Sequence, residues 1–158
     1  MNERDPNAQA SLLDRLIDSE PGVSHEPVQF RLQDVRQAKA SVIRDLENLL
    51  NTRRPPEDFS RDYPYVRNSL LVYGLKDFSA SNHRSVATLQ RLSTEIERMI
   101  SQFEPRLHNV AVTLDVDVGN ERVLHFRISG TLIVEPLSEP VTFDTVLDMN
   151  RAQFKVSR

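Results

Sequence analysis

The hydrophobic residues upstream of Pro105 recur three and four positions apart in two long stretches, at about residues 32–50 and 85–103. This spacing gathers them on one face of a helix, so the sequence predicts two long amphipathic α-helices. The opposite face of the first helix carries charged residues and is interpreted as a solvated surface: Arg36, Lys39, Arg44, Asp45 and Glu47.

Downstream of Pro105 the spacing changes, and from Val110 apolar and polar residues alternate. A period of two is typical of strands with one buried face. The alternation predicts strands at residues 110–118, about 122–134 and 141–148, with a hairpin turn at Gly119-Asn120 and a tail in which Phe154 and Val156 alternate as well. Gly130, inside the second of these strands, indicates a bulge or a close backbone approach.

A shorter helix is expected from Pro64 to Tyr73, with Gly74 as its left-handed C-terminal turn. Its buried residues would be Val66, Leu70 and Leu71. The predicted fold class is therefore α+β, with two long helices and short helices packed on one face of a small, mainly antiparallel sheet formed by a C-terminal meander.

The length of 158 residues fits one domain with trimmed ends. Residues 1–27, rich in Ser, Pro, Gly and Glu outside a short apolar stripe at about 11–18, are predicted to form a flexible arm with a short amphipathic helix. That helix either docks on its own domain or binds another protein. The domain itself is placed at residues 28–150 and a C-terminal tail at 151–158.

Composition excludes several classes of function. The net charge of −3 gives no global attraction to nucleic acid or to an acidic membrane. The absence of cysteine removes disulfide scaffolds and thiolate zinc sites. The four histidines lie at positions that suggest neither a metal-ligand spacing nor a nucleophile's partner: His25, His83, His108 and His125. We therefore predict no catalytic residue, no metal site and no cofactor. The absence of cysteine fits a reducing compartment, so a cytoplasmic protein is expected. No run approaches the roughly 20 apolar residues that span a bilayer, so a partner would have to bring the protein to any membrane at which it works.

One catalytic alternative is a peptidoglycan-cleaving, lysozyme-like enzyme. Glycoside hydrolysis needs two carboxyl groups across a cleft, and Glu104 could act as the acid with Asp115 or Asp117 as its partner. The residues argue against it, because a paired Arg106 would lower the pKa of Glu104 where an acid needs a raised one. The chain also has no Trp to stack on sugars.

The sequence Glu104-Pro105-Arg106 allows two interpretations. In the first, Pro105 ends the second long helix and its neighbours are ordinary surface charges. In the second, the proline makes a stiff corner that holds the two charges outward, where the arginine could bind a carboxylate or backbone carbonyls of a partner protein.

Five segments in this order resemble the GPW/lysozyme-like baseplate wedge family, in its type VI secretion branch: SLLDRL, DLENLLNTR, YPYVRNSLLVYGLKDFS, RLSTEIERMISQFEPRL and FDTVLD. The resemblance implies an α+β fold and an assembly role, in which the protein clamps the other wedge subunits and initiates the contractile sheath. The implied partners are the wedge subunits TssF, TssG and TssK, the sheath proteins TssB and TssC, and the hub or spike. It implies neither nucleic-acid binding nor direct membrane insertion, and it places the chain at a baseplate docked on the inner membrane.

The family's Glu-Pro-Arg hallmark falls on Glu104, Pro105 and Arg106, which favours the interface interpretation of those residues. The segments Leu50-Asn51-Thr52-Arg53 and Tyr73-Gly74-Leu75 also match family motifs and are interpreted as mainly structural. We further hypothesise that the third strand around 141–147, or the tail, offers a free edge to the sheath. The candidate partner-binding residues are Glu104, Pro105, Arg106, Arg53, Val141, Phe143 and Phe154. A small adaptor that binds a single partner remains an alternative.

Overall fold

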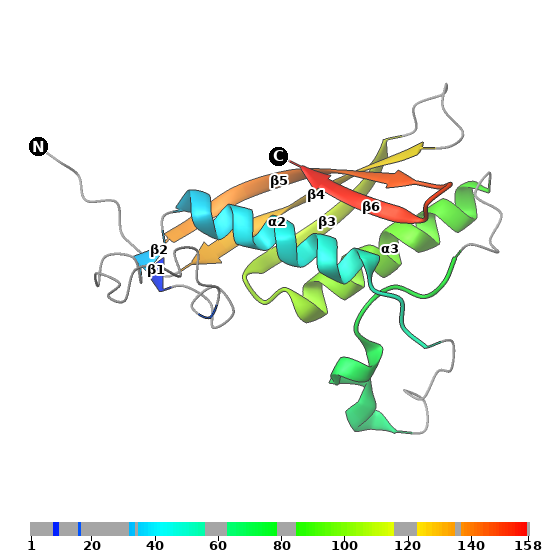
Figure 1. Ribbon diagram of the computed structural model, residues 1–158, viewed down its shortest axis with the longest axis horizontal. Helices are drawn as coiled ribbons and strands as arrows, with labels where there is room; N and C mark the ends of the chain where they lie inside the picture. Colours follow the sequence, from blue (N-terminus) through cyan, green and yellow to red (C-terminus); the bar gives the residue numbers. More distant parts are fainter. Residues whose placement is uncertain are drawn as a thin grey trace, which may run out of the picture.

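The computed structural model describes residues 8–9, 16, 32–33, 35–55, 63–78, 85–115, 123–134 and 137–157. Its elements in chain order are β1 (Ala8–Gln9), β2 (Leu32–Gln33), α2 (Val35–Asn51), η2 (Pro64–Asn68), η3 (Leu70–Val72), α3 (Val86–Phe103), β3 (Leu107–Asp115), β4 (Val123–Val134), β5 (Leu137–Asp148) and β6 (Gln153–Ser157) (Figure 1). The predicted arm over residues 1–27 lies outside the described residues except for β1, which pairs with β2, and Leu16. The predicted turn at Gly119-Asn120 lies outside them as well.

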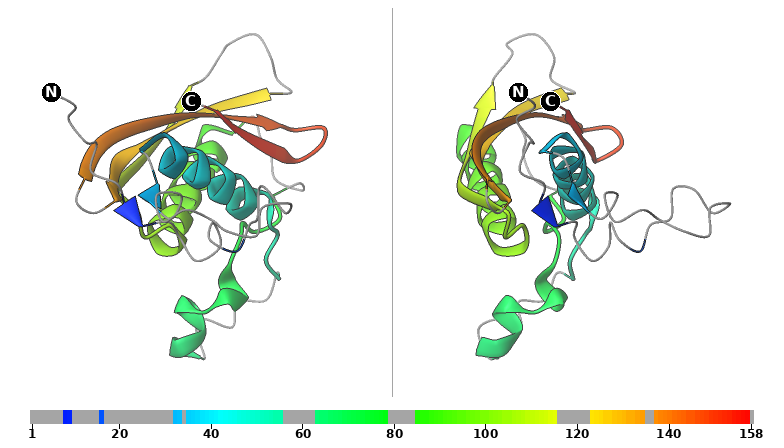
Figure 2. Two further views of the ribbon diagram at one scale, coloured as in Figure 1. Left: turned by 60° about the vertical axis from the view of Figure 1, so that its left-hand side comes forward. Right: turned by 90° about the vertical axis from the view of Figure 1, so that its left-hand side faces the viewer.

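Strands β3 to β6 form one antiparallel sheet in the order of the chain, β3-β4-β5-β6. The sheet is curved, and both long helices lie on its concave side (Figure 2). The predicted α+β class with an antiparallel meander is therefore confirmed. The tail predicted from residue 151 contributes a fourth strand, β6, which pairs with the end of β5.

The two long helices are close to their predicted bounds. Helix α2 begins at Val35 rather than at residue 32, because Leu32–Gln33 pairs with β1 instead. Helix α3 begins after Ser85, which takes the N-cap position although its side chain makes no capping bond. Within the described part of the chain, no helix has the length and apolar character to cross a lipid bilayer.

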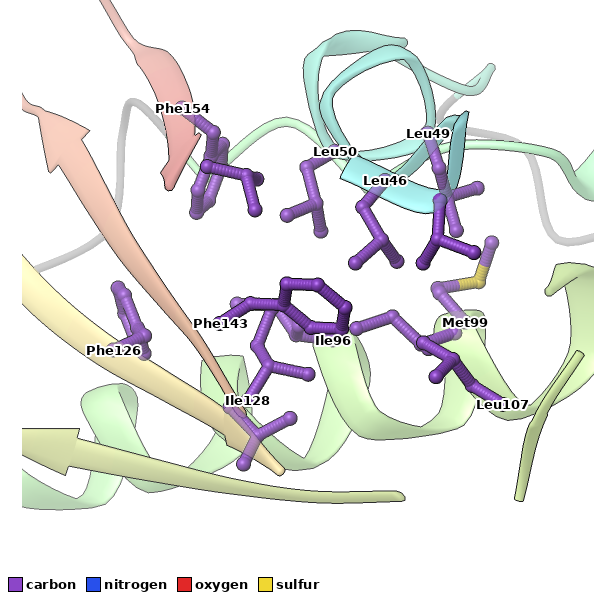
Figure 3. Close-up of a cluster of buried hydrophobic side chains, with 14 of the residues drawn as sticks. Leu46, Leu49, Leu50, Ile96, Met99, Leu107, Phe126, Ile128, Phe143 and Phe154 are labelled. Carbon is purple, nitrogen blue, oxygen red and sulfur yellow. The ribbon is translucent and has the colours of Figure 1, made fainter. Parts of the chain in front are cut away.

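The core lies between the two helices and the concave face of the sheet (Figure 3). Its residues are those that the two periods mark as inward-facing, because a helix and a strand bury one face each. The largest fully buried side chains are Val42, Leu46, Leu50, Leu75, Ile96, Met99, Ile100, Phe126, Ile128, Phe143, Leu147 and Phe154.

The short helix predicted from Pro64 to Tyr73 is wrong in two respects. The segment forms two 3₁₀ turns, η2 and η3, separated by Ser69 in an extended conformation. The Ser69 hydroxyl donates to the carbonyl of Val66 and accepts from the N–H of Leu71, so it competes with helical backbone bonding. Leu70 and Leu71 are exposed rather than buried, and the segment projects away from the sheet and the long helices (Figures 1 and 2).

Strand β3 begins at Leu107, three residues earlier than predicted. A bulge between His108 and Ala111 shifts the pairing with β4, and it also breaks the alternation of apolar and polar residues on which the prediction depended. Asn109 in that bulge has a positive φ of 52°. Gly130 lies opposite, and a Cβ atom built there would be 3.1 Å from the carbonyl oxygen of His108. The close approach predicted at Gly130 is therefore confirmed.

Candidate docking site at the proline corner

The corner between α3 and β3 is a tight turn whose geometry follows from its proline. Helix α3 ends at Phe103, and the N–H of Glu104 still donates to the carbonyl of Ile100 at 2.8 Å. The N–H of Leu107 then donates to the carbonyl of Glu104 at 3.1 Å, which closes a four-residue turn with Pro105 at its second position. Proline favours that position because its fixed φ suits the turn.

The side chain of Arg106 joins three polar groups. Its Nε and Nη2 donate to the two carboxylate oxygens of Glu104, at 2.7 and 2.6 Å. Nη2 also donates to Oδ2 of Asp45 at 2.6 Å, and Nη1 donates to the Ser41 hydroxyl at 2.9 Å. Since Ser41 and Asp45 belong to α2, the arginine holds the end of α3 against that helix. We call the four residues the brace: Ser41, Asp45, Glu104 and Arg106.

Burial and charge oppose each other in the brace. Burial alone would lower the pKa of Arg106, but hydrogen bonds and charge from Glu104 and then from Asp45 outweigh it and raise that pKa above its ordinary value. The pKa of Tyr73 is raised, first by burial and then by the nearby charges of Asp45 and Glu104. The guanidinium of Arg106 stays charged at neutral pH, because arginine ionises far above that pH.

A groove of about 520 Å³ opens beside the brace. Its lining combines apolar and charged groups: Asp45, Asn48, Leu49, Tyr73, Phe103, Glu104, Pro105 and Arg106. The rings of Tyr73 and Phe103 meet edge to face, with their centroids 5.2 Å apart. Its carboxylates are already paired, Glu104 and Asp45 with Arg106 and Asp45 also with Arg44 at 3.0 Å, so the groove offers a ligand chiefly its apolar and aromatic wall.

The expectation that the corner holds its charges outward is wrong. Glu104 is only 4% exposed, and the Arg106 side chain is 22% exposed and turned toward α2. Of the three hallmark residues, only Pro105 is exposed. The proline fixes the backbone, but the direction of the two side chains is set by the hydroxyl and carboxylate that α2 supplies.

Arg53, the fourth candidate from the sequence, also makes internal contacts. Its Nη1 donates to the carbonyl of Leu50 at 2.9 Å and its Nη2 to the carbonyl of Ala152 at 2.6 Å. Its guanidinium lies over the ring of Phe78, 5.0 Å from the centroid. Burial lowers the pKa of Arg53, and Asp77 partly opposes that effect. Arg53 thus ties the end of α2 to the turn between β5 and β6.

The three candidates on strands are buried in the core. Val141 is 8% exposed, Phe143 1% and Phe154 2%. The hypothesis that the third strand is a free edge is wrong, because β5 pairs with β4 on one side and with β6 on the other.

Strand β6 is an edge of the sheet, as the tail version of that hypothesis requires, but α2 covers its outer side. The amide of Asn51 donates to the carbonyl of Phe154 and accepts from its N–H, at 2.9 and 2.8 Å. The carboxylate of Glu47 accepts from the N–H of Val156 at 2.9 Å. Side chains of α2 therefore occupy backbone groups that an added strand would need.

The opposite edge of the sheet is β3, and among the described residues no strand pairs with its outer side. The N–H of Val112 points away from β4, since it donates to Oε2 of Glu97 at 3.4 Å. Leu114, two residues farther on, presents its backbone to the same side. This bond of Val112 is longer than those that cover β6.

Several of these residues were missed at the level of sequence. Asp45, Glu47 and Lys39 were interpreted as a solvated face, yet Asp45 belongs to the brace and Glu47 covers β6. Lys39 is 9% exposed and donates to Glu139 at 2.7 Å. Ser41 and Asp45 are four positions apart, so they share one face of the helix, and that spacing is the only local signal of the brace.

The brace is a poor arrangement for acid catalysis. Both carboxylate oxygens of Glu104 already accept hydrogen bonds from Arg106, and the residue is only 4% exposed. Asp115, one of the two proposed catalytic partners, is exposed and pairs loosely with Arg127 at 4.0 Å. Asp117, the other, lies outside the described residues.

Comparison with known proteins gives one match to a family. The model of a family described as baseplate wedge protein gp25 matches residues 36–137, more than half of the 158-residue chain. Among solved structures, the chain resembles one titled the baseplate complex from the type VI secretion system, with a TM-score of 0.48 and 20% identity, over 69% of this chain and 93% of that one. That likeness is too distant to support an argument about function. No curated protein sequence matches at a significant level.

Proposed function

The chain belongs to the gp25 baseplate wedge family, and from that premise we propose that it is a structural, non-enzymatic subunit of a type VI secretion baseplate, in the place of TssE. The wedge domain of this proposal spans residues 28–150 together with β6, and residues 1–27 lie outside it, although β1 pairs with β2. The protein works in the cytoplasm, at a baseplate held on the inner membrane by its partners. The observation that carries the proposal is the brace beside an open groove.

In this proposal the brace does not bind a partner itself. It holds the groove in the shape that a partner binds. Arg106 makes four internal hydrogen bonds, so a partner that recruited it would have to break bonds to buried Glu104. The groove, in contrast, is lined by an exposed proline and by the apolar wall of Tyr73 and Phe103. A preorganised groove gains affinity because less ordering is needed on binding. We assign to it the clamping of the other wedge subunits, TssF, TssG and TssK.

Sheath initiation belongs, in this proposal, to the edge of β3. An extended segment of a sheath protein, TssB or TssC, would pair with the outward backbone groups of Val112 and Leu114. The long bond from Val112 to Glu97 is supporting evidence, because it is easier to displace than the shorter bonds over β6. The buried candidates Val141, Phe143 and Phe154 contribute to this role through the core that shapes the sheet.

The test of the clamp is binding to a purified complex of the other wedge subunits. Asn48 is exposed on the groove and takes no part in the brace, so Asn48→Arg fills the groove without unfolding the chain. We expect a loss of affinity of about 30-fold or more, with thermal stability unchanged. The matched control is Asn150→Arg, at an exposed position in the turn between β5 and β6 that does not line the groove. Equal affinities for both variants and the wild type would reject the clamp.

Two simple measurements address the alternatives. A cell-wall turbidity assay with Glu104→Gln as control detects a lysozyme-like enzyme, and clearing that depends on Glu104 would contradict the proposal. Copurification separates a wedge subunit from an adaptor: a wedge subunit recovers several baseplate proteins together, whereas a stable complex with one protein alone would favour the adaptor.

A further inference from the structure

A second surface, distinct from the brace and the groove, projects from the domain. We define the limb as residues 63–72, which contain η2 and η3. It extends away from the helices and the sheet (Figure 1). Four of its large side chains are exposed: Tyr63 at 61%, Tyr65 at 95%, Leu70 at 81% and Leu71 at 63%. They outnumber the exposed large hydrophobic residues on the rest of the described chain, which are Leu16, Val86 and Ile133.

The limb keeps its shape without burying these side chains. Its backbone closes a series of short turns, in which Val66, Ser69, Val72 and Tyr73 donate to carbonyls three residues earlier at 2.9–3.2 Å. The Ser69 hydroxyl adds two further bonds within the limb. Exposed apolar residues on a locally ordered backbone cost little ordering entropy when a partner covers them.

The base of the limb is clamped to the end of α2. The N–H of Leu75 donates to the carbonyl of Thr52 at 2.9 Å, and the N–H of Arg54 donates to the carbonyl of Leu75 at 3.0 Å. The side chain of Leu75 is fully buried. Gly74 has a φ of +95° and lies so close to Thr52 that a Cβ atom would be 2.4 Å from its carbonyl oxygen. The limb is therefore fixed to the core at its base, while its four large side chains remain exposed.

From this geometry we infer that the limb is an anchor that inserts into an apolar groove on another protein of the wedge. The inference rests on the proposed function for the identity of the complex, but not on the role of the brace. Between Tyr63 and Leu75 the sequence has one charged residue, Arg67, so the limb offers a partner a mainly apolar surface. Tyrosine and leucine side chains at the tip provide the apolar contact.

The exposed area argues against a second copy of this chain as the occupant. The two tyrosines expose about 300 Å² and the limb as a whole roughly 500 Å², on the usual size of such side chains. Two limbs that packed together would bury about 1,000 Å², less than the roughly 1,200 Å² of a stable interface. A larger partner could contact the groove and the limb together. Tyr73 lines the groove, and its N–H donates to the carbonyl of Leu70 on the limb, so the two surfaces adjoin.

The experiment measures binding of the full chain to a purified complex of the other wedge subunits. The test variant is Tyr65→Ser/Leu70→Ser, and the control is Val86→Ser, which removes a side chain of similar exposure, 68%, from the first turn of α3. We expect the limb variant to lose affinity about 30-fold or more while the control binds like the wild type. Thermal unfolding of both variants should match the wild type, because the removed side chains are exposed.

Four other results would contradict the inference, and one of them would also contradict the proposed function. If the wild type binds and the limb variant binds equally well, the inference is wrong and the proposed function stands. If the wild type does not bind the complex at all, the proposed function fails and takes the inference with it. Concentration-dependent dimerisation that the limb variant abolishes would identify a second copy as the occupant and overturn the inference. Cosedimentation with anionic lipid vesicles, lost in the same variant, would identify a membrane instead and also overturn it.

Discussion

Replacing Arg106 with methionine removes the cation of the brace and leaves the carboxylate of Glu104 buried without a counter-charge. Removing one partner of a buried ion pair typically costs 3–5 kcal/mol of unfolding free energy. The side chains of Arg106 and Asp45 are 22% and 27% exposed, so water reaches part of the gap and the lower end of that range applies. We expect a loss of about 3 kcal/mol at neutral pH, or about 6–12 °C in melting temperature for a domain of this size.

A double-mutant cycle with Glu104→Gln separates this mechanism from simple loss of packing. The double variant Glu104→Gln/Arg106→Met no longer buries a charge, so it should be more stable than Arg106→Met alone. Urea unfolding followed by circular dichroism gives all four free energies, and the slopes with denaturant should agree. If Arg106→Met cost less than about 1 kcal/mol, or if the two single losses simply added, the brace would not be the coupled network described above.

Three further predictions concern residues around the groove and the sheet edge. First, the pKa of Tyr73 is raised, so its phenolate forms less readily in the folded than in the unfolded chain and stability falls as the pH rises through about 10 and above. The difference in phenolate absorbance between the wild type and Tyr73→Phe should therefore titrate above the value of free tyrosine, and a midpoint at or below it would contradict the electrostatics of the groove. Second, Gly74→Ala should lower the free energy of unfolding by about 2 kcal/mol or more, because alanine disfavours the φ of +95° and its Cβ collides with the Thr52 carbonyl. Calorimetry measures the change in melting temperature, and an unchanged value would refute the clamp at the base of the limb. Third, Asn51→Ala removes the partner of the N–H and the carbonyl of Phe154. We therefore expect the free energy of unfolding to fall by about 1–3 kcal/mol and hydrogen exchange at the Phe154 amide to become faster. Unchanged protection of that amide would show that α2 does not hold β6.

Much of the fold could be predicted from the sequence, because a helix or strand with one buried face has its apolar residues at a regular spacing. Ile96, Met99 and Ile100 recur at helical spacing, and Phe126 and Ile128 at strand spacing, and all five are in the core. The period depends only on neighbours in the chain, so no knowledge of the tertiary structure is needed to detect it. The exceptions are Leu70 and Leu71, which have the same spacing as buried residues but lie exposed on the limb. Spacing alone does not distinguish a side chain that faces the core from one that faces solvent.

The candidate site shows where local reasoning stops. The pairing of Glu104 with Arg106 is predictable, since two residues flank one proline. The contribution of Asp45 is not, because it is 61 positions away from Arg106 along the chain and reaches it only when α2 packs beside the corner. The same packing turns both charges inward. A motif of three residues thus fixed the backbone and left the direction of the side chains to the tertiary structure.

The presence of an ionic brace at this corner is itself informative, because buried ion pairs are weak evidence for stability and are often replaceable by apolar residues. An apolar cluster could hold α3 against α2 equally well, but it would tolerate small sliding movements of the two helices. The fork of Arg106 accepts only one arrangement of Glu104, Asp45 and Ser41, since each bond has a direction. That directionality also fixes the width of the groove and the position of its aromatic wall, Tyr73 against Phe103. The proposed function, in which the chain places several neighbours in register, requires such a fixed surface more than it requires the last increment of stability.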